Sequence, residues 1–352
     1  MAHSAHRCTK VTLPARKWKW RMRGAAVWFT RCDTGWMKSG DDVDLILCSD
    51  MLSAADLRAL LPARRRSVPI ICYFHENQLT YPIPVEEDRD FQYGMTNVTS
   101  CLAADAVWFN SRFHLEDFLG AADRLLKMMP DFVPAEVVAE LRRKAEVHTP
   151  PVLFDPVPRP PNRPDEPLVV LWCHRWEYDK NPEPFFDALL KLDEAGYPFR
   201  LVLLGEQFRT APPIFADSWE RLQRRVLHAG FVADRRAYAA ILTKCDLVVS
   251  TAVQETFGIA AVEAMLAGCQ PAFPRRLAYP ELLPNQLHAA CLFDRDEDLF
   301  EMLRRAIERG RLLSAGDVTD LQRSLSTRFG GPDSVRRIDD AMVKVHAAAQ
   351  NA

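Results

Sequence analysis

The sequence contains no run of apolar residues that approaches the ~20 residues of a membrane-spanning helix. Its polar N-terminus also lacks the apolar core of a signal peptide. The nine cysteines are an odd number and include no Cys-x-x-Cys pair, which argues against both a disulfide framework and a zinc site. These absences favour a reducing, cytoplasmic location, with no membrane association and no stable protein partner evident.

Acidic side chains are missing from the first 32 positions, where eight basic residues stand, although the net charge of the whole chain is only −2. The stretch could form a basic face or an ordinary solvated surface. Within it, Lys17, Lys19 and Arg21 alternate with Trp18 and Trp20. Cations with interleaved aromatic rings suit RNA phosphates and unstacked bases. An edge strand whose indoles pack inward is an equally good interpretation.

Proline is concentrated in residues 150–167, where it fills eight of eighteen positions. Such a segment cannot form a helix or a central strand, and its composition is typical of a semi-rigid connector. Because 352 residues suffice for two domains, the connector predicts an N-terminal domain over residues 1–149 and a C-terminal domain over residues 168–352.

Apolar strand patterns alternate with helix patterns in both parts of the chain. In the second part we predict strands over Leu168–Cys173, Phe199–Leu204, Ala229–Val232 and Leu247–Thr251, and helices over Pro182–Gly196 (with Asn181 as N-cap), Trp219–His228, Arg235–Lys244 and Gly258–Ala267. In the first part we predict strands over Val43–Cys48, Val68–Phe74 and Ala106–Phe109, and helices over Ala54–Leu61, Phe91–Ala104 and Ser111–Leu119. A terminal helix, Val335–Ala349, is assigned to the second domain. The alternation predicts an α/β fold of two Rossmann-like domains that face each other across a cleft.

Polar side chains end the apolar strand pattern at Phe74, where His75, Glu76 and Asn77 follow directly. Ligands of open parallel sheets bind beyond the carboxyl ends of the strands, so we predict that these three residues belong to a site. The alternative is that they cap the next helix or satisfy backbone groups of the loop.

Two glutamates, Glu255 and Glu263, flank and enter the helix that follows the strand Leu247–Thr251. Eight helical residues span about 12 Å, which matches the distance between the two sugars of a nucleotide-sugar. The backbone N–H groups near Phe257 and Gly258 open the helix and suit an anion. Glu263 could instead be an exposed carboxylate, but its helix is apolar nearly all round, so an ionised Glu263 would need a partner.

Arg175 and Lys180 lie in the loop after the first strand of the second domain, where two cations could neutralise a diphosphate leaving group. A structural salt bridge with Glu177 or Asp179 is the alternative. Gly205, which ends the next strand, completes the predicted donor-binding set.

Seven segments resemble those of a known family: LPARKWKWR (Leu13–Arg21), YFHENQLTYP (Tyr73–Pro82), RDFQYG (Arg89–Gly94), FNSRF (Phe109–Phe113), HRWEYDKNPE (His174–Glu183), LGEQF (Leu204–Phe208) and YPE (Tyr279–Glu281). The Glu255–Glu263 pattern with Arg175 and Lys180 resembles the donor site of retaining GT-B glycosyltransferases. More narrowly, the chain resembles the glycosyltransferase-like domain-containing family that includes tRNA-queuosine α-mannosyltransferase.

The resemblance implies a GDP-mannose donor and, as acceptor, the cyclopentene-diol side chain of queuosine in a tRNA anticodon. Arg175 and Lys180 would bind the diphosphate, Glu263 the nucleotide ribose and Glu255 the transferred hexose, without a metal or other cofactor. His75, Glu76 and Asn77, which with Glu255 form the predicted catalytic set, would orient hydroxyl groups of the acceptor or the hexose. The cations and tryptophans of Lys17–Arg21, independently of the resemblance, predict the tRNA contact. A lipid or small-molecule acceptor, or a non-catalytic nucleotide-sugar-binding homologue, is the alternative.

Two further expectations concern the first domain. The resemblance implies a strand, a loop and a helix before Leu13, where this sequence has only twelve residues, so we expect a sheet that lacks its first strand. Asp42-Val43-Asp44 has the Asp-x-Asp form of metal-dependent glycosyltransferases, but we interpret it as surface charge.

Overall fold

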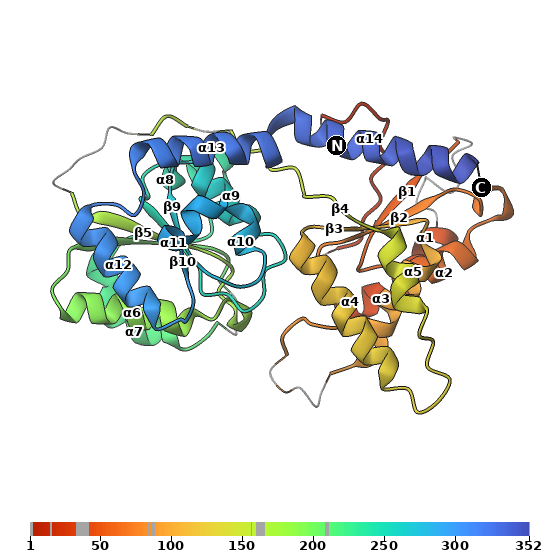
Figure 1. Cartoon of the computed structure of the whole chain (residues 1–352), viewed down its shortest axis with the longest axis horizontal. Helices are drawn as coiled ribbons and strands as arrows, with labels where there is room; N and C mark the ends of the chain where they lie inside the picture. Colours follow the sequence, from red (N-terminus) through yellow and green to blue (C-terminus); the bar gives the residue numbers. More distant parts are fainter. Residues whose placement is uncertain are drawn as a thin grey trace. The chain divides into compact units, whose positions relative to one another are not determined.

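The computed structural model describes residues 3–14, 16–32, 42–83, 85, 89–155, 157–159, 166–207 and 211–351 (Figure 1). The chain forms two compact units, one of residues 1–149 with 335–352 and the other of residues 150–334. The first boundary coincides with the start of the proline-rich segment, of which residues 160–165 lie outside the described residues. The predicted assignment of the terminal helix to the second domain is corrected, because residues 335–352 belong to the first unit.

The first unit contains a parallel sheet with the strand order β1-β2-β3-β4. Its strands are β1 (Ile46–Ser49), β2 (Ile70–Phe74), β3 (Ala106–Phe109) and β4 (Ala145–Val147). Its helices are α1 (Trp18–Arg31), α2 (Ala54–Leu60), α3 (Phe91–Ala103), α4 (Arg112–Lys127), α5 (Val137–Lys144) and, from residue 335, α14 (Gly331–Gln350), with a 3-10 turn at Ala63–Arg65. The sequence predicted β3 within its bounds, whereas β4, α1 and α5 were not predicted.

The two faces of this sheet explain why the terminal helix belongs here. Cys72 and Phe74 of β2 face the core formed with α1 to α5. Ile71 and Tyr73, which alternate with them, pack with Trp108 against the apolar side of α14. Because successive side chains of a strand point to opposite faces, the all-apolar pattern of β2 requires cover on both sides, and α14 supplies it on one.

Helix α1 overturns the interpretation of Lys17–Arg21 as part of an edge strand. Its buried residues are Met22, Ala25, Ala26 and Thr30, a spacing of three and four that fits a helix. The alternation of Trp18 and Trp20 with cations suggested a strand, but the buried positions that follow have the helical period and decide the structure.

The second unit contains a six-stranded parallel sheet with the order β10-β9-β8-β5-β6-β7. Its strands are β5 (Leu168–Cys173), β6 (Phe199–Leu204), β7 (Val226–Gly230), β8 (Leu247–Val249), β9 (Gln270–Pro274) and β10 (Leu292–Phe293). Its helices are α6 (Pro182–Glu194), α7 (Ile214–Leu222), α8 (Arg235–Leu242), α9 (Ile259–Leu266), α10 (Tyr279–Leu282), α11 (His288–Cys291), α12 (Asp298–Arg309) and α13 (Ala315–Phe329), with 3-10 turns at Tyr178–Lys180 (η3), Gln223–Arg225 (η4) and Asn285–Leu287 (η5). Figure 1 shows α6, α7 and α12 on one face of this sheet and α8, α9 and α13 on the other.

The strand order reverses between β5 and β8. From β5 the chain proceeds to β6 and β7 in one direction, and then to β8, β9 and β10 in the other. The carboxyl ends of the two strands at such a reversal form the usual ligand-binding position of open parallel sheets. The loops after Cys173 and Val249 are therefore where a ligand of this unit is expected.

Two predictions for this unit need correction. The predicted helix Trp219–His228 ends at Leu222, because Val226 and the residues after it pair with β6 as strand β7. Asn181 precedes α6 but does not cap it, since its side chain donates to the backbone oxygen of Thr251 at 3.2 Å. None of the described helices is long and apolar enough to cross a membrane.

Candidate functional site

The strand reversal of the second unit brings together a predicted cation and a predicted carboxylate. The Lys180 Nζ atom lies 3.6 Å from Oε2 of Glu255, and it donates to the backbone oxygen of Gln254 at 2.7 Å. Lys180 comes from η3, after β5, whereas Glu255 follows β8. Two of the predicted donor-binding residues, from loops 75 positions apart in the chain, are thus neighbours at the carboxyl edge of the sheet.

Asp179 holds these two loops together. Its backbone oxygen accepts from the N–H groups of Val253 and Gln254 at 3.0 and 3.2 Å. Its carboxylate is 1% exposed and lies 3.1 Å from the Lys180 ammonium. A buried carboxylate needs such a cation, so Lys180 is fixed in the site before any ligand binds.

Arg175 forms the salt bridge with Glu177 that the sequence analysis gave as its alternative role. This salt bridge uses only some of the N–H donors of the guanidinium group. The Nη1 atom lies 2.9 Å from Glu177, and Nη2 lies 3.9 Å from Asp179. The side chain keeps 48% of its surface exposed. Because a guanidinium has five N–H donors, Arg175 can hold Glu177 and still contact a diphosphate.

Glu263 has the partner that its apolar helix requires. Its Oε1 atom accepts from Arg235 at 2.6 Å, and its Oε2 atom accepts from the Tyr238 hydroxyl at 3.0 Å. Both partners belong to α8, and the Glu263 hydrogen bond raises the pKa of Arg235 above its ordinary value. The sequence indicated that a partner was needed, but nothing in it singled out these two residues.

The remaining residues that were predicted to bind the donor could offer a ligand only their backbone groups. The Phe257 ring is buried against Phe329, with ring centroids 5.1 Å apart, so only its backbone can serve a ligand. Gly258 precedes α9 with a φ of 93°. Gly205 has a φ of 148°, and a Cβ at this position would lie 1.8 Å from the backbone oxygen of His174. This close approach of the β6 end to the loop after β5 requires glycine.

In the first unit, His75 is held by a residue that the sequence analysis missed. Its Nδ1 atom lies 3.2 Å from Oδ1 of Asn110, and the Asn110 amide donates back to the His75 backbone oxygen at 3.1 Å. The Asn110 contact requires hydrogen on Nδ1, which makes Nε2 the hydrogen-bond acceptor of the neutral ring. Partial burial of the imidazole ring lowers the pKa of His75 below its ordinary value. This shift favours the neutral form of the ring.

Asp50 is the second missed residue, and it fixes the backbone of the same loop. Its Oδ1 atom accepts from the His75 N–H at 3.0 Å. Burial raises the pKa of Asp50 to about 7. Asp50 and Asn110 each stand directly after a strand, as His75 does, so the strand-end rule applied to every strand would have found them.

Asn77 has the alternative role given in the sequence analysis, because its side chain satisfies backbone groups of the loop. Its side chain is fully buried, and Oδ1 accepts from the backbone N–H groups of Leu79 and Thr80 at 3.0 Å each. This is a turn that stabilises the loop. Glu76, which precedes it, is half-buried. The structure therefore gives Asn77 a structural role and leaves His75 and Glu76 as the candidates for ligand contact.

The predicted RNA-contacting residues Lys17, Trp18, Lys19 and Trp20 are exposed at the start of α1, whereas Arg21 is half-buried. The Trp18 ring lies 5.2 Å from the ring of Tyr93 in the first turn of α3. The exposed indoles and cations exclude the interpretation in which these tryptophans pack inward.

Comparison with known proteins identifies the family. The sequence model described as "tRNA-queuosine alpha-mannosyltransferase N-terminal" matches residues 1–152, and that of "Glycosyl transferases group 1" matches residues 155–311. The tRNA-queuosine alpha-mannosyltransferase of Drosophila melanogaster is 36% identical over 284 residues, which are 78% of this chain and 74% of that protein. The chain belongs to the tRNA-queuosine alpha-mannosyltransferase family.

Two further similarities are lower in sequence identity. A GDP-mannose-dependent alpha-(1-6)-phosphatidylinositol dimannoside mannosyltransferase of Mycobacterium tuberculosis is 30% identical over 147 residues, 40% of this chain and 36% of that protein. The structure of sucrose-phosphate synthase from Thermosynechococcus elongatus superimposes with a TM-score of 0.68 at 17% identity, covering 96% of this chain and 81% of that one. This likeness shows the fold alone, and it confirms the predicted GT-B class. The chain is therefore a GT-B glycosyltransferase.

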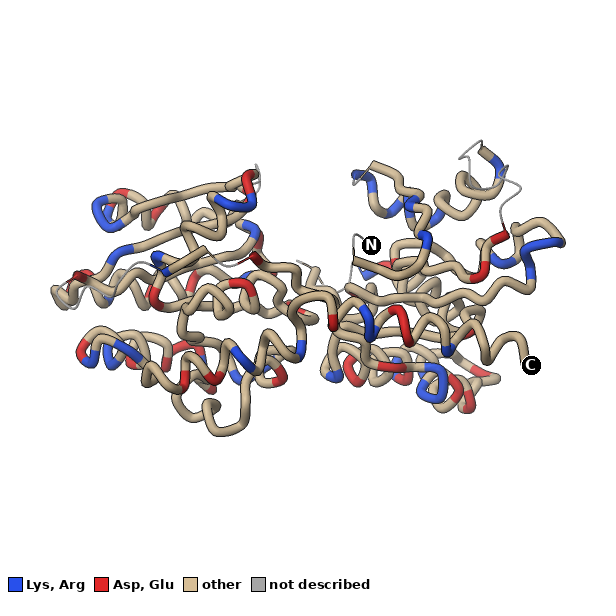
Figure 2. The backbone as a smooth tube through the Cα atoms, turned by 90° about the horizontal axis from the view of Figure 1, so that it is seen from above, with Lys and Arg blue, Asp and Glu red and all other residues tan. Residues whose placement is uncertain are grey.

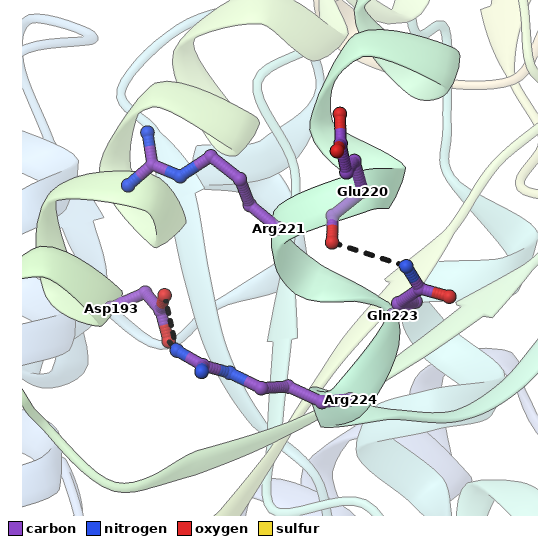
Figure 3. Close-up of a pocket in the computed structure, with 5 residues that line it drawn as sticks. All are labelled: Asp193, Glu220, Arg221, Gln223 and Arg224. Carbon is purple, nitrogen blue, oxygen red and sulfur yellow. Dashed lines mark hydrogen bonds and ion pairs between the residues drawn. The ribbon is translucent and has the colours of Figure 1, made fainter.

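A pocket of about 610 Å³ in the second unit of this family member lies away from the candidate site (Figure 3). It is lined by Asp193, Glu220, Arg221, Gln223 and Arg224. These residues come from the end of α6, from α7 and from η4, before strands β6 and β7 begin. Its charges pair locally, as Arg224 does with Asp193 at 2.9 Å. The predicted donor-binding residues lie instead after the carboxyl ends of the strands.

Acid destabilises the second unit of this glycosyltransferase through His174. Burial, together with the nearby charges of Lys180 and Arg175, lowers the pKa of His174 to about 3. Since the folded pKa lies below the unfolded value of ~6.5, the stabilisation is complete above pH 6.5 and is lost as the pH falls from 6.5 towards 3. We expect wild type to lose about 2 kcal/mol more than His174→Gln between pH 7 and 5. Urea unfolding at both pH values measures this difference, and equal losses in the two proteins would contradict it.

Proposed function

We propose that the protein transfers mannose from GDP-mannose to the queuosine of a tRNA, and that it acts in the cytoplasm. The observation that carries the proposal is the Lys180–Glu255 pair at the strand reversal of the second unit, 3.6 Å apart. In this proposal the cation would contact a phosphate of the donor, and the neighbouring carboxylate would accept hydrogen bonds from sugar hydroxyls. The acceptor follows from the family, since the Drosophila melanogaster relative is named for queuosine in tRNA, and the donor from the mycobacterial relative, which is named as GDP-mannose-dependent.

The chemistry requires that a negative leaving group be stabilised. In the transfer, the bond between mannose C1 and the β-phosphate oxygen breaks, and a bond from C1 to a queuosine hydroxyl oxygen forms on the same face. The hydroxyl proton passes to the departing phosphate, which gives GDP and mannosyl-queuosine. Lys180 and Arg175 would neutralise the phosphate charge as it develops, while Glu255 would accept hydrogen bonds from the hexose and His75 would orient an acceptor hydroxyl.

The test of the proposed function is mass spectrometry of nucleosides from queuosine-containing tRNA incubated with the purified protein. GDP-mannose, GDP-glucose and UDP-glucose are supplied in separate reactions. A hexose added to queuosine with GDP-mannose alone is the expected result. Transfer from UDP-glucose alone would replace the donor, and GDP-mannose binding without any transfer would overturn the acceptor.

We also propose that the reaction needs no metal, because Lys180 and Arg175 would balance the charge of the phosphates. Addition of excess EDTA to the purified protein is expected to change the transfer rate less than about twofold, whereas loss of a required metal would abolish a metal-assisted step. A rate that falls with EDTA and returns with added Mg²⁺ or Mn²⁺ would refute this part of the proposal.

Glu263→Ala is expected to weaken GDP-mannose binding about 10- to 100-fold. The proposed cause is the loss of one hydrogen bond from a ribose hydroxyl to the carboxylate, which is worth about 1.5–3 kcal/mol. Isothermal titration calorimetry measures the Kd. Glu220→Ala serves as the control, because Glu220 is an exposed carboxylate of α7 in the same unit. Wild-type affinity in Glu263→Ala would remove Glu263 from the site.

A further inference from the structure

Helix α1 presents an unusual combination of exposed tryptophan and positive charge. Trp20, Trp28 and Trp18 are 70%, 49% and 41% exposed. The segment that contains them has no acidic residue before position 33, whereas Lys and Arg alternate with Asp and Glu along most of the chain (Figure 2). We call the exposed residues Lys19, Trp20, Arg23 and Trp28, together with Trp18 and Tyr93, the α1 surface.

The helical spacing places Trp20 and Trp28 on the same side of α1. Trp20, Gly24 and Trp28 are four residues apart, so they follow one another along the same face. A Cβ on Gly24 would lie 3.7 Å from Nε1 of Trp20, which shows that the indole extends along the helix over the glycine. The indole of Trp20 therefore lies along the helix, and the residue is 70% exposed.

The cations of the α1 surface are held over aromatic rings. The Arg23 guanidinium carbon lies 5.2 Å from the ring centroid of Tyr93, and the Lys19 Nζ atom lies 5.9 Å from it. Lys19 and Arg23 are both exposed to solvent. Cation–π contacts favour these positions of the side chains and do not neutralise their charge, so both cations could contact an anion.

The α1 surface continues into the loop that carries His75. Tyr93 stands in the first turn of α3, four residues after Arg89. Arg89 donates to the backbone oxygens of Gln78 and Tyr81 at 3.4 and 3.1 Å. An extended ligand on the α1 surface would therefore approach the loop in which we place the acceptor-orienting residues.

We propose that the α1 surface binds the anticodon loop of the acceptor tRNA, with Lys19 and Arg23 on phosphates and Trp20 stacked on an unpaired base. This inference rests on the proposed function. RNA loops offer phosphates and splayed bases together. A membrane-surface helix offers a broad apolar face to the lipid. Helix α1 buries Met22, Ala25 and Ala26 inside the unit, and its exposed positions include the cations Lys19 and Arg23 as well as Trp20, Val27 and Trp28.

The test is binding of a fluorescently labelled queuosine-containing anticodon hairpin by fluorescence anisotropy over a series of salt concentrations. Lys19→Ala/Arg23→Ala is expected to weaken binding and to reduce the slope of log K against log salt concentration by about 1 to 2. Trp20→Ala is expected to weaken binding about 5- to 150-fold with an unchanged slope, because a stacked base contributes about 1–3 kcal/mol.

Matched controls come from elsewhere in the first unit. Arg143→Ala removes an exposed cation of α5, and Phe132→Ala removes a ring that is 94% exposed. Both are expected to bind the hairpin as wild type does. Melting temperatures show whether each variant is folded, and GDP-mannose affinity reports on the second unit independently of the RNA.

The outcomes separate this inference from the proposed function. Wild type that mannosylates tRNA, with α1 variants that bind the hairpin as the controls do, would overturn the α1 surface alone. Wild type that binds neither hairpin nor whole tRNA would overturn both. Binding of phosphatidylserine–phosphatidylcholine vesicles that depends on Trp20, with RNA binding unchanged, would assign the surface to a membrane instead.

Discussion

Lys180→Met is expected to reduce kcat/KM for mannosyl transfer by about 10³-fold, which corresponds to ~4 kcal/mol of transition-state stabilisation. The proposed cause is the loss of the ammonium that neutralises the leaving diphosphate. Lys180 is only 7% exposed, and its Nζ atom lies 3.6 Å from Oε2 of Glu255, the carboxylate that we propose for the hexose. Steady-state kinetics with saturating tRNA measures the effect.

The same substitution also affects stability, and a second variant separates the two effects. Removal of Lys180 takes away the nearest cation of the buried Asp179 carboxylate and leaves only Arg175 at 3.9 Å, which costs up to about 3–5 kcal/mol for a broken buried pair. Asp179→Asn/Lys180→Met removes both charges and is expected to recover most of that stability while remaining inactive. Recovery of transfer in the double variant would mean that Lys180 acts only on the fold. Lys127→Met, which breaks an exposed pair with Asp123, is the control and should cost less than ~1 kcal/mol.

Gly205→Ala is expected to destabilise the second unit by about 4 kcal/mol or more, among the largest effects of a single substitution. An added Cβ would lie 1.8 Å from the His174 backbone oxygen. Backbone atoms of a buried strand end cannot move aside as the tip of a flexible side chain can. Urea unfolding, monitored by tryptophan fluorescence, measures the change in the free energy of unfolding.

Gly196→Ala provides the comparison that isolates the steric cause. Gly196 follows α6 with a φ of 77°, and nothing lies within 4 Å of the position its Cβ would take. Only the left-handed backbone opposes alanine there, at a cost of about 1–2 kcal/mol. Equal destabilisation by the two substitutions would show that backbone conformation, and not the contact with His174, determines the requirement at Gly205.

The elements that the sequence predicted best are those in which local pattern and tertiary environment agree. Leu168–Cys173 and Phe199–Leu204 are continuous apolar runs, and both form central strands with those bounds. Trp219–His228 has a helical pattern throughout, yet pairing of Val226 with Leu201 converts its last residues to strand β7. No local signal reveals a strand that is specified by its neighbour in the sheet.

The candidate site shows a similar limit. A strand-end rule selected His75, Arg175 and Glu255, because each stands in or near a polar run after an apolar strand. The partners that hold them are single residues on other elements, such as Asn110 for His75 and Arg235 for Glu263. Such pairings depend on sheet register and helix placement, which a single sequence does not display. Asn77 shows the opposite error, since a polar residue in the right place serves the turn.

The discontinuity of the first unit has a consequence for synthesis on the ribosome. The apolar face formed by Ile71, Tyr73 and Trp108 is covered by α14 residues, which are translated only after the whole of residues 150–334. The N-terminal segment also depends on α14 for its contacts, because Ser4 and Ala5 donate to the carboxylate of Asp339 at 2.8 and 2.7 Å. The second unit is contiguous and can fold as it emerges, whereas the nascent first unit exposes an aggregation-prone sheet face for most of the remaining elongation. The first unit is therefore expected to complete its fold only after the second unit has been synthesised.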